Sequence, residues 1–417
     1  MLAVHSRRLG ALAGRLGRGR ASRALTVGGL SSAGNFLVAI SVTRLETVDG
    51  VGRFAVAFSF YVLASGLTRA AVTDSVLAAG LGTAPAREAS RRVAAVGAAA
   101  AVAVVAGGLA FDSPYLLIAG TALPGLVLYD YLKAVSLGVG SPGLAFRMEV
   151  CWLGLTVATV ALGLWGVVGP VVVFAGWSAG GALLGYATAW RCRYPARPGW
   201  GADRAESRRA AAFGTQFLIT TGSAQLALTA VAGMAGTAVV GALSAGRTVL
   251  GPMNLVVATA SALILPYLSR ERTAPAAARR RAAVRLGVLV TTGVVPLALA
   301  VALLPDRVGT MLLGGNWDVA RSLLPLLVLE SLLAVPAAVG FAGLRIEGAT
   351  SRTVVAGTVL GVLRVPVVVA GAVFLGATGA ACALVVMALL SALAWCHAYH
   401  LLLRRQGRAR ELTAQPA

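Results

Sequence analysis

Residues 191–210, RCRYPARPGWGADRAESRRA, form the longest polar stretch of this 417-residue chain. The stretch contains six arginines together with prolines and glycines, a composition typical of a linker. On both sides of it, apolar runs of about 18 to 25 residues follow one another, and each is long enough as a helix to cross ~30 Å of hydrocarbon. The stretch therefore predicts two membrane-embedded halves joined by a polar connection.

The composition agrees with a membrane protein. The chain is 58% hydrophobic and 12% charged, with a mean hydropathy of +0.82, so a water-soluble fold would lack the polar residues to cover its surface. The runs exceed the ~10 alternating residues of an outer-membrane strand. We therefore predict an all-α polytopic membrane protein with twelve transmembrane helices. The spans are expected near 24–43, 54–80, 93–110, 115–138, 148–168, 170–190, 211–233, 239–266, 286–304, 322–343, 353–374 and 379–402.

The linker divides these spans into two sets of six. The expected organisation is a basic cytoplasmic segment 1–23, an N-terminal six-helix lobe 24–190, a cytoplasmic linker 191–210, a C-terminal six-helix lobe 211–402 and a cytoplasmic tail 403–417. The segment VGRFAVA at 51–57 is similar to VGALSAG at 240–246, which lies 189 residues later. Each segment follows the first span of its half. An even number of spans would give both halves the same orientation, as in transporters that arose by duplication.

The positions of the basic residues predict the topology. The chain carries a net charge of +21, and 28 of its 36 lysines and arginines fall in segments on the same side as the N-terminus. The positive-inside rule predicts that this side, with both termini, faces the cytoplasm. The expected location is the plasma membrane or inner membrane of the cell. Anionic lipid headgroups are sufficient partners for these arginines, so nucleic acid is not an expected partner.

Several kinds of chemistry are not expected. The single lysine, Lys133, is not preceded by the residues of a phosphate-binding loop, and the three histidines lie near predicted cytoplasmic ends. No CxxC pair is present, and the G-x-S-x-G match GWSAG at 176–180 lies inside the predicted span 170–190, not at the strand-to-helix turn of a nucleophile elbow. We expect no enzyme activity, no cofactor and no metal site, which leaves transport or a passive structural role.

Ionisable residues within the spans are the main candidate functional residues, because each is costly in a bilayer unless paired or hydrated. Lys133 follows Asp130 by three residues and either pairs with it while reaching the headgroups or takes part in transport. Glu330 and Arg364 are expected at similar depth, where an ion pair would hold two helices together or couple to an ion.

Two further arginines are candidates for contact with a substrate. Arg247 has no carboxylate three or four residues away, which indicates water or an anionic ligand near it. Arg69 either pairs with Asp74 or reaches Asp130 on another helix. The seventh span is also polar on a broad face that includes Gln216 and Gln225, although threonine hydrogen bonds within the helix are an alternative explanation for its polarity.

Longer segments resemble a known family. The similar segments are TRLETVDGVGRFAVAFSF at 43–60, GTAVVGALSAGRTVLGPMNLVVATASALILPYLSR at 236–270, LLGGNWDVARSLLPLLVLE at 312–330, GLRIEGATSR at 343–352 and GATGAACAL at 376–384. Together they resemble the multidrug/oligosaccharidyl-lipid/polysaccharide (MOP) exporter superfamily, and within it the polysaccharide flippases. The resemblance covers essentially the whole chain.

The resemblance implies two six-helix lobes that form a V around a central cavity lined chiefly by spans 1, 2, 7 and 8. It implies transport of a polyprenyl-diphosphate-linked saccharide from the inner to the outer leaflet by alternating access, alongside glycosyltransferases or a polymerase of polysaccharide assembly. The substrate would then meet Arg247, Arg69, Asn35, Gln216, Gln225 and Asn254. The sequence departs from the family in having Asp74 where a basic residue is frequent and Gln225 where an acidic one is.

Other functions remain open from the sequence. A drug or cation antiporter of the same superfamily would need carboxylates in its cavity, and Asp130 and Glu330 are the only acids expected deep in the membrane, each with a cationic neighbour. A membrane glycosyltransferase or polymerase would need larger external loops than the sequence provides. A scaffold without transport activity is a further alternative.

Overall fold

The computed structural model describes residues 2–78, 83–138, 141–201 and 204–414. Every regular element in these residues is a helix, which confirms the predicted all-α class. The helices group into two compact units, which do not divide the chain at one point. Unit 1 contains Met1–Leu45 and Phe60–Thr215, and unit 2 contains Glu46–Ser59 and Gln216–Ala417.

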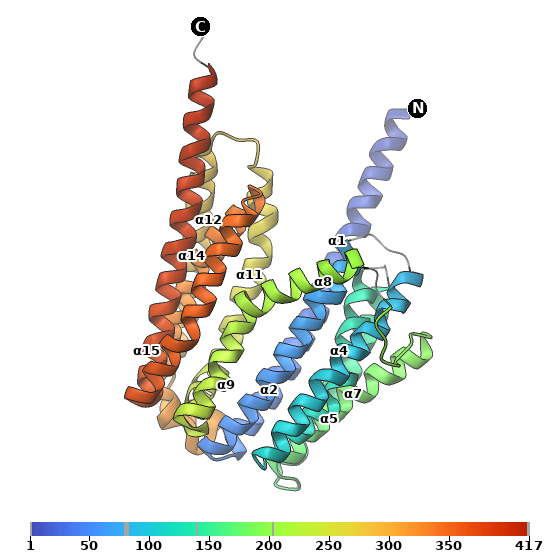
Figure 1. Ribbon diagram of the computed structural model, residues 1–417, viewed down its shortest axis with the longest axis vertical. Helices are drawn as coiled ribbons and strands as arrows, with labels where there is room; N and C mark the ends of the chain where they lie inside the picture. Colours follow the sequence, from blue (N-terminus) through green and yellow to red (C-terminus); the bar gives the residue numbers. More distant parts are fainter. Residues whose placement is uncertain (1, 79–82, 139–140, 202–203, 415–417) are drawn as a thin grey trace. The chain divides into compact units, whose positions relative to one another are not determined.

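Unit 1 contains the N-terminal helices (Figure 1). In chain order they are α1 (Leu2–Leu45), the second part of α2 (Val48–Thr68), the π-helix η1 (Arg69–Thr73), α3 (Asp74–Ala78), α4 (Thr83–Ala110), α5 (Pro114–Gly138), α6 (Pro142–Leu164), α7 (Pro170–Arg191) and most of α8 (Arg204–Phe217). The central helix is α5, which packs against both α4 and α7 and has most of its side chains buried.

Aromatic side chains fill the interior of unit 1. The ring of Trp177 on α7 lies edge-on to Tyr61, with centroids 5.3 Å apart. Trp152 Nε1 on α6 donates a hydrogen bond of 2.8 Å to the carbonyl oxygen of Trp177. The linker is tied to the same unit, because Ser90 Oγ donates to the carbonyl of Pro195 and Arg92 on α4 pairs with Glu206 on α8. The polar stretch that separates the two sets of spans is therefore folded against α4 along part of its length.

Unit 2 contains the C-terminal helices. They are the π-helix η2 (Leu218–Gly222), α9 (Ser223–Ala235), α10 (Thr237–Val249), α11 (Gly251–Arg270), α12 (Ala276–Ala302), α13 (Asp306–Leu313), the 3-10 turn η3 (Gly314–Asn316), α14 (Trp317–Ile346) and α15 (Thr350–Ala414), together with the start of α2. Helices α12, α14 and α15 lie side by side (Figure 1). Within α15 the chain kinks at Leu375 and Gly376, and Gly376 has a φ of 61°, a conformation that glycine adopts without a steric penalty.

The structure does not confirm the number twelve. Among the described residues, nine segments are long and apolar enough to cross a membrane. One of them, Thr353–Gln406, bends at Gly376 and contains both predicted spans 353–374 and 379–402. The predicted span 211–233 falls on α8, η2 and α9, and the span 239–266 on α10 and α11, which are shorter helices interrupted at η2 and Leu250.

The two similar segments at 51–57 and 240–246 meet within unit 2, where the start of α2 crosses α10. A Cβ added to Gly52 would lie 1.9 Å from the carbonyl oxygen of Thr237, and one added to Gly241 would lie 1.8 Å from that of Val48. Asp49 accepts a hydrogen bond from Thr237 at the same crossing. Two glycines therefore allow the backbones to touch, as small residues do between membrane helices.

Substitution of Gly241 by valine is expected to destabilise unit 2 by about 3 kcal/mol, because the side chain must push α2 away from α10. Thermal unfolding of the purified protein in detergent measures this as a lower Tm. The matched control is Gly233→Ala in α9, where an added Cβ meets nothing within 4 Å and the Tm should stay the same or rise. Equal Tm values for Gly241→Val and wild type would contradict the tight crossing.

Candidate functional site

Each unit contains a cluster of charged side chains within its helices. In unit 1 the centre is Lys133 on α5, whose Nζ lies 3.2 Å from Asp130 Oδ1 and 2.8 Å from Glu149 Oε1 on α6. It also donates a hydrogen bond of 3.2 Å to Ser31 Oγ on α1. The side chains of Lys133 and Glu149 are only 17% and 2% exposed, so the ammonium group is held inside the unit.

Glu149 corrects the expectation that Asp130 and Glu330 are the only deep acids. The sequence places it at the edge of a predicted span, where an acid is unremarkable, but the fold buries it against α5. Asp130 is further held by hydrogen bonds from Tyr61 Oη, at 3.1 Å, and from Ser65 Oγ, both on α2. Two carboxylates thus share one ammonium group, which leaves this cluster with a formal surplus of one negative charge.

A cavity of about 440 Å³ opens beside this cluster and is lined by Asp130, Lys133, Ser65 and Arg69 among others. Arg69 is the first residue of η1, and its Nε lies 3.6 Å from Asp74 Oδ1, with both side chains more than half exposed. The structure therefore brings Arg69 to Asp74, the first of its two expected partners. Single π-helical turns inside α-helices are frequent at functional sites, which makes η1 notable.

In unit 2 the structure pairs residues that the sequence did not pair. Arg247 Nη2 on α10 lies 2.9 Å and 3.2 Å from the two carboxylate oxygens of Glu330 on α14. The expected ion pair between Glu330 and Arg364 is wrong, since Arg364 forms no ion pair with any residue that the structure describes. Arg247 lacks a carboxylate on its own helix, and its partner comes from 83 positions further along the chain.

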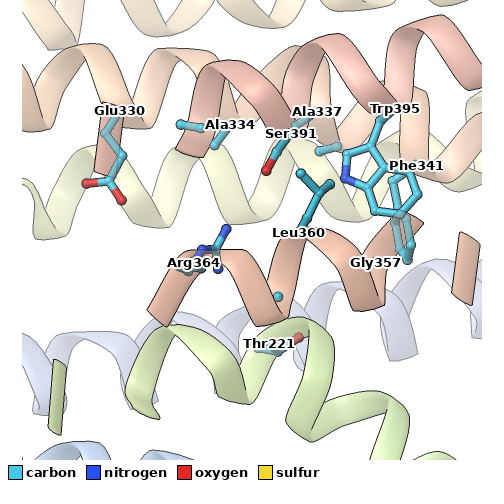
Figure 2. A pocket seen from close by; sticks show the side chains of 13 residues that line it. Thr221, Glu330, Ala334, Ala337, Phe341, Gly357, Leu360, Arg364, Ser391 and Trp395 are labelled. Atoms are coloured by element: carbon cyan, nitrogen blue, oxygen red, sulfur yellow. The ribbon is translucent and has the colours of Figure 1, made fainter. Parts of the chain in front are cut away.

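Glu330 and Arg364 line a cavity of about 320 Å³ between η2, α14 and α15 (Figure 2). Figure 2 shows these two charged groups at one end of the cavity and the rings of Phe341 and Trp395 at the other, with Ser391 between them. The two rings are in edge contact, with centroids 5.1 Å apart. The cavity therefore has a charged end and an aromatic end, and its one lining carboxylate, Glu330, is paired with Arg247, which does not line the cavity.

The other predicted substrate contacts are dispersed. Asn35 on α1 has a buried Oδ1 without a hydrogen-bond donor among the described residues, and the exposed Asn254 on α11 accepts a bond of 3.5 Å from Ser331 Oγ. Gln216 and Gln225 are half-buried, the first on α8 before η2 and the second on α9 after it. Thr229 Oγ1 donates to the carbonyl of Gln225, so part of the polarity of this span is used within its own helix.

A third buried charge cluster, between α12, α14 and α15, is not signalled by the sequence. Arg279 donates to Glu347 and, at 2.8 Å, to Gln406 Oε1, and Gln406 Nε2 donates to Glu347 Oε2 at 3.0 Å. The side chains of Arg279 and Glu347 are 5% and 6% exposed. Arg279 lies in a run of three arginines expected to face lipid headgroups, and only packing distinguishes it from the other two.

Comparison with solved structures identifies the architecture. An inward-facing multidrug-resistance MATE transporter of the MOP superfamily superposes with a TM-score of 0.64 at 16% identity, covering 92% of this chain and 96% of that one. The chain has the MOP fold. The lipid II flippase MurJ in an inward closed conformation superposes with a TM-score of 0.68 at 10% identity, over 94% and 93% of the two chains.

A third protein with the MOP fold, a transporter from Pyrococcus furiosus, superposes with a TM-score of 0.55 at 14% identity over 92% of this chain and 94% of that one. Its description refers to a binding pocket of reverse polarity that suggests a different function. No protein-family model matches the chain, and no curated protein matches it as a relative. The resemblance seen in the sequence is thus confirmed for the fold, and the apolar helices agree with a multi-pass membrane protein.

Proposed function

We propose that the protein is an exporter that moves a polyprenyl-diphosphate-linked saccharide from the inner to the outer leaflet by alternating access, for cell-surface polysaccharide assembly. The observation that carries the proposal is the charge of the unit 2 cavity. Arg247 pairs with Glu330, and the guanidinium of Arg364 at the same end of the cavity forms no ion pair with a described residue. A half-buried guanidinium inside a membrane protein favours an anionic ligand.

The shape of the cavity also suits this substrate class. A guanidinium presents a planar fork of donors that matches phosphate oxygens in a bidentate geometry. The aromatic end, formed by Phe341 and Trp395, offers flat apolar surfaces with a polar edge, and Ser391 lies between the two ends. A ligand with a charged phosphate group and a less polar remainder would therefore use both ends.

A drug or cation antiporter is the alternative, and the ion pairs argue against it. Such a protein needs a carboxylate that is free to bind the cation, but Glu330 is held by Arg247. Asp130 accepts hydrogen bonds from Tyr61 and Ser65 and pairs with Lys133. The Lys133 cluster has one carboxylate more than it has cations. This carboxylate favours a role for unit 1 in which the cluster takes up a proton or cation and so drives transport.

The test is leaflet-resolved labelling of lipid-linked saccharides in cells that lack the protein and are complemented by wild type or variants. Arg364→Gln should lower outer-leaflet substrate by at least about tenfold, because a charge-assisted contact with phosphate is worth roughly 1.5–3 kcal/mol. Glu330→Gln should retain export, because it leaves both guanidinium groups in place. The matched control is Arg53→Gln, a half-exposed residue at the start of α2 whose one ion pair among the described residues is with Asp49 four residues earlier.

The opposite pattern would favour the antiporter. If Glu330→Gln abolishes export of cationic dyes while Arg364→Gln leaves lipid-linked saccharide unchanged in both leaflets, the flippase assignment fails. Adjacent genes for glycosyltransferases or a polymerase would be consistent with the proposed partners. Labelling of single cysteines from each side of the cell membrane would test the proposed cytoplasmic termini.

A further inference from the structure

A second cavity in unit 2, of about 500 Å³, lies between α12, α14 and α15 and is separate from the charged cavity of Figure 2. One end is formed by Arg280 near the start of α12 and His400 near the end of α15. The other residues that line it are apolar or weakly polar and include Val284, Val288 and Pro336. The cavity is therefore a groove with one basic end.

The basic end is not neutralised within the described part of the chain. Arg279, the preceding residue, points inward and is bound by Glu347 and Gln406. Arg280 is exposed, lines the groove, and forms no ion pair with any described residue. The imidazole of His400 adds a hydrogen-bond donor beside it, and the exposed Arg404 follows one turn later on α15. This arrangement favours a phosphate group that is not part of the chain.

The rest of the groove has the dimensions of an acyl chain. On α12 the lining residues run from Arg280 to Thr292, a helical distance of roughly 18 Å, whereas half of a ~30 Å hydrocarbon core is about 15 Å. Gly287 contributes no side chain to the groove, and a Cβ there would meet only Val339, at 3.9 Å. An apolar groove of this length would be long enough to reach from the headgroups to the middle of a membrane.

We infer that this groove binds one anionic glycerophospholipid from the leaflet on the side of the C-terminus, with its phosphate at Arg280 and His400 and an acyl chain along α12 between α14 and α15. The inference rests on the charge and shape of the groove and does not depend on the transported substrate. A bound lipid would cover the apolar groove and neutralise Arg280, so it would stabilise the packing of these three helices.

The test is native mass spectrometry of the purified full-length protein released from detergent after titration with phosphatidylglycerol or phosphatidylcholine of identical acyl chains. Wild type should retain more phosphatidylglycerol than phosphatidylcholine. Arg280→Gln should lower retained phosphatidylglycerol by about fivefold, the effect expected of one cation near a phosphate. Gly287→Leu should lower retention of both lipids, since the side chain fills the groove and leaves the charges unchanged.

The matched control is Arg281→Gln, because Arg281 is also exposed on α12 but does not line the groove. Equal retention of the two lipids by wild type would overturn the inference, as would an equal loss in Arg280→Gln and Arg281→Gln. Complete displacement of phosphatidylglycerol by millimolar inorganic phosphate would show a site for free anions instead. A dimer that dissociates as phosphatidylglycerol is added would show that a second copy of the chain occupies the groove.

Discussion

Lys133→Met is expected to prevent accumulation of folded protein. The substitution leaves Asp130 and Glu149 inside unit 1 without the ammonium group that both contact. Removal of one partner from a buried ion pair costs about 3–5 kcal/mol, and here two carboxylates lose their partner together. That loss is comparable to the stability of a typical domain. Fluorescence-detected size-exclusion chromatography of a tagged protein measures it as the loss of the monodisperse peak.

A second substitution should restore part of that loss. In Lys133→Met/Glu149→Gln only Asp130 stays charged, and it keeps its hydrogen bonds from Tyr61 and Ser65. The folded peak should therefore return in part. The control Arg53→Met breaks a half-exposed pair with Asp49 and should cost less than about 1 kcal/mol. A Lys133→Met protein with the same yield and Tm as wild type would show that the two carboxyl groups do not need the lysine.

Arg279→Met is expected to destabilise unit 2 by about 3–5 kcal/mol. The variant leaves Glu347, which is 6% exposed, with Gln406 as its one remaining side-chain hydrogen-bond partner in the described part of the chain. The cost arises because a buried carboxylate loses its countercharge, while methionine retains much of the apolar volume. Thermal unfolding in detergent should show a clear drop in Tm, with loss of packing between α12, α14 and the end of α15.

The double variant Arg279→Met/Glu347→Leu distinguishes the effect of the ion pair on stability from the effect of side-chain packing. If the buried charge causes the loss, removing both members should recover most of the Tm, because apolar replacements of a buried pair are often neutral. Arg272→Met is the control, since Arg272 is exposed and shares no ion pair with a described residue. A double variant no more stable than Arg279→Met would show that the hydrogen-bond geometry, and not the unpaired charge, determines the stability here.

The candidate sites show how far sequence reasoning reaches. The contact between Lys133 and Asp130 is predictable, because two residues that are three positions apart on one helix lie on the same face. The close crossing at Gly52 and Gly241 agrees with the similarity of two short segments. By contrast, the expected contact of Glu330 with Arg364 is wrong, although both residues do line one cavity. Similar depth in a membrane allows a contact between helices but does not select the partner.

The sequence by itself determined the helical membrane class, because helix length and hydropathy are local properties that the bilayer thickness selects. It also indicated the MOP fold, which the solved structures confirm. Only the tertiary structure decided that Arg247 binds Glu330, that Glu149 shares Lys133, and that Arg279 turns inward while Arg280 faces a groove. The reason is physical: a charge is neutralised by its neighbour in space, and helix packing brings that neighbour from a distant part of the chain.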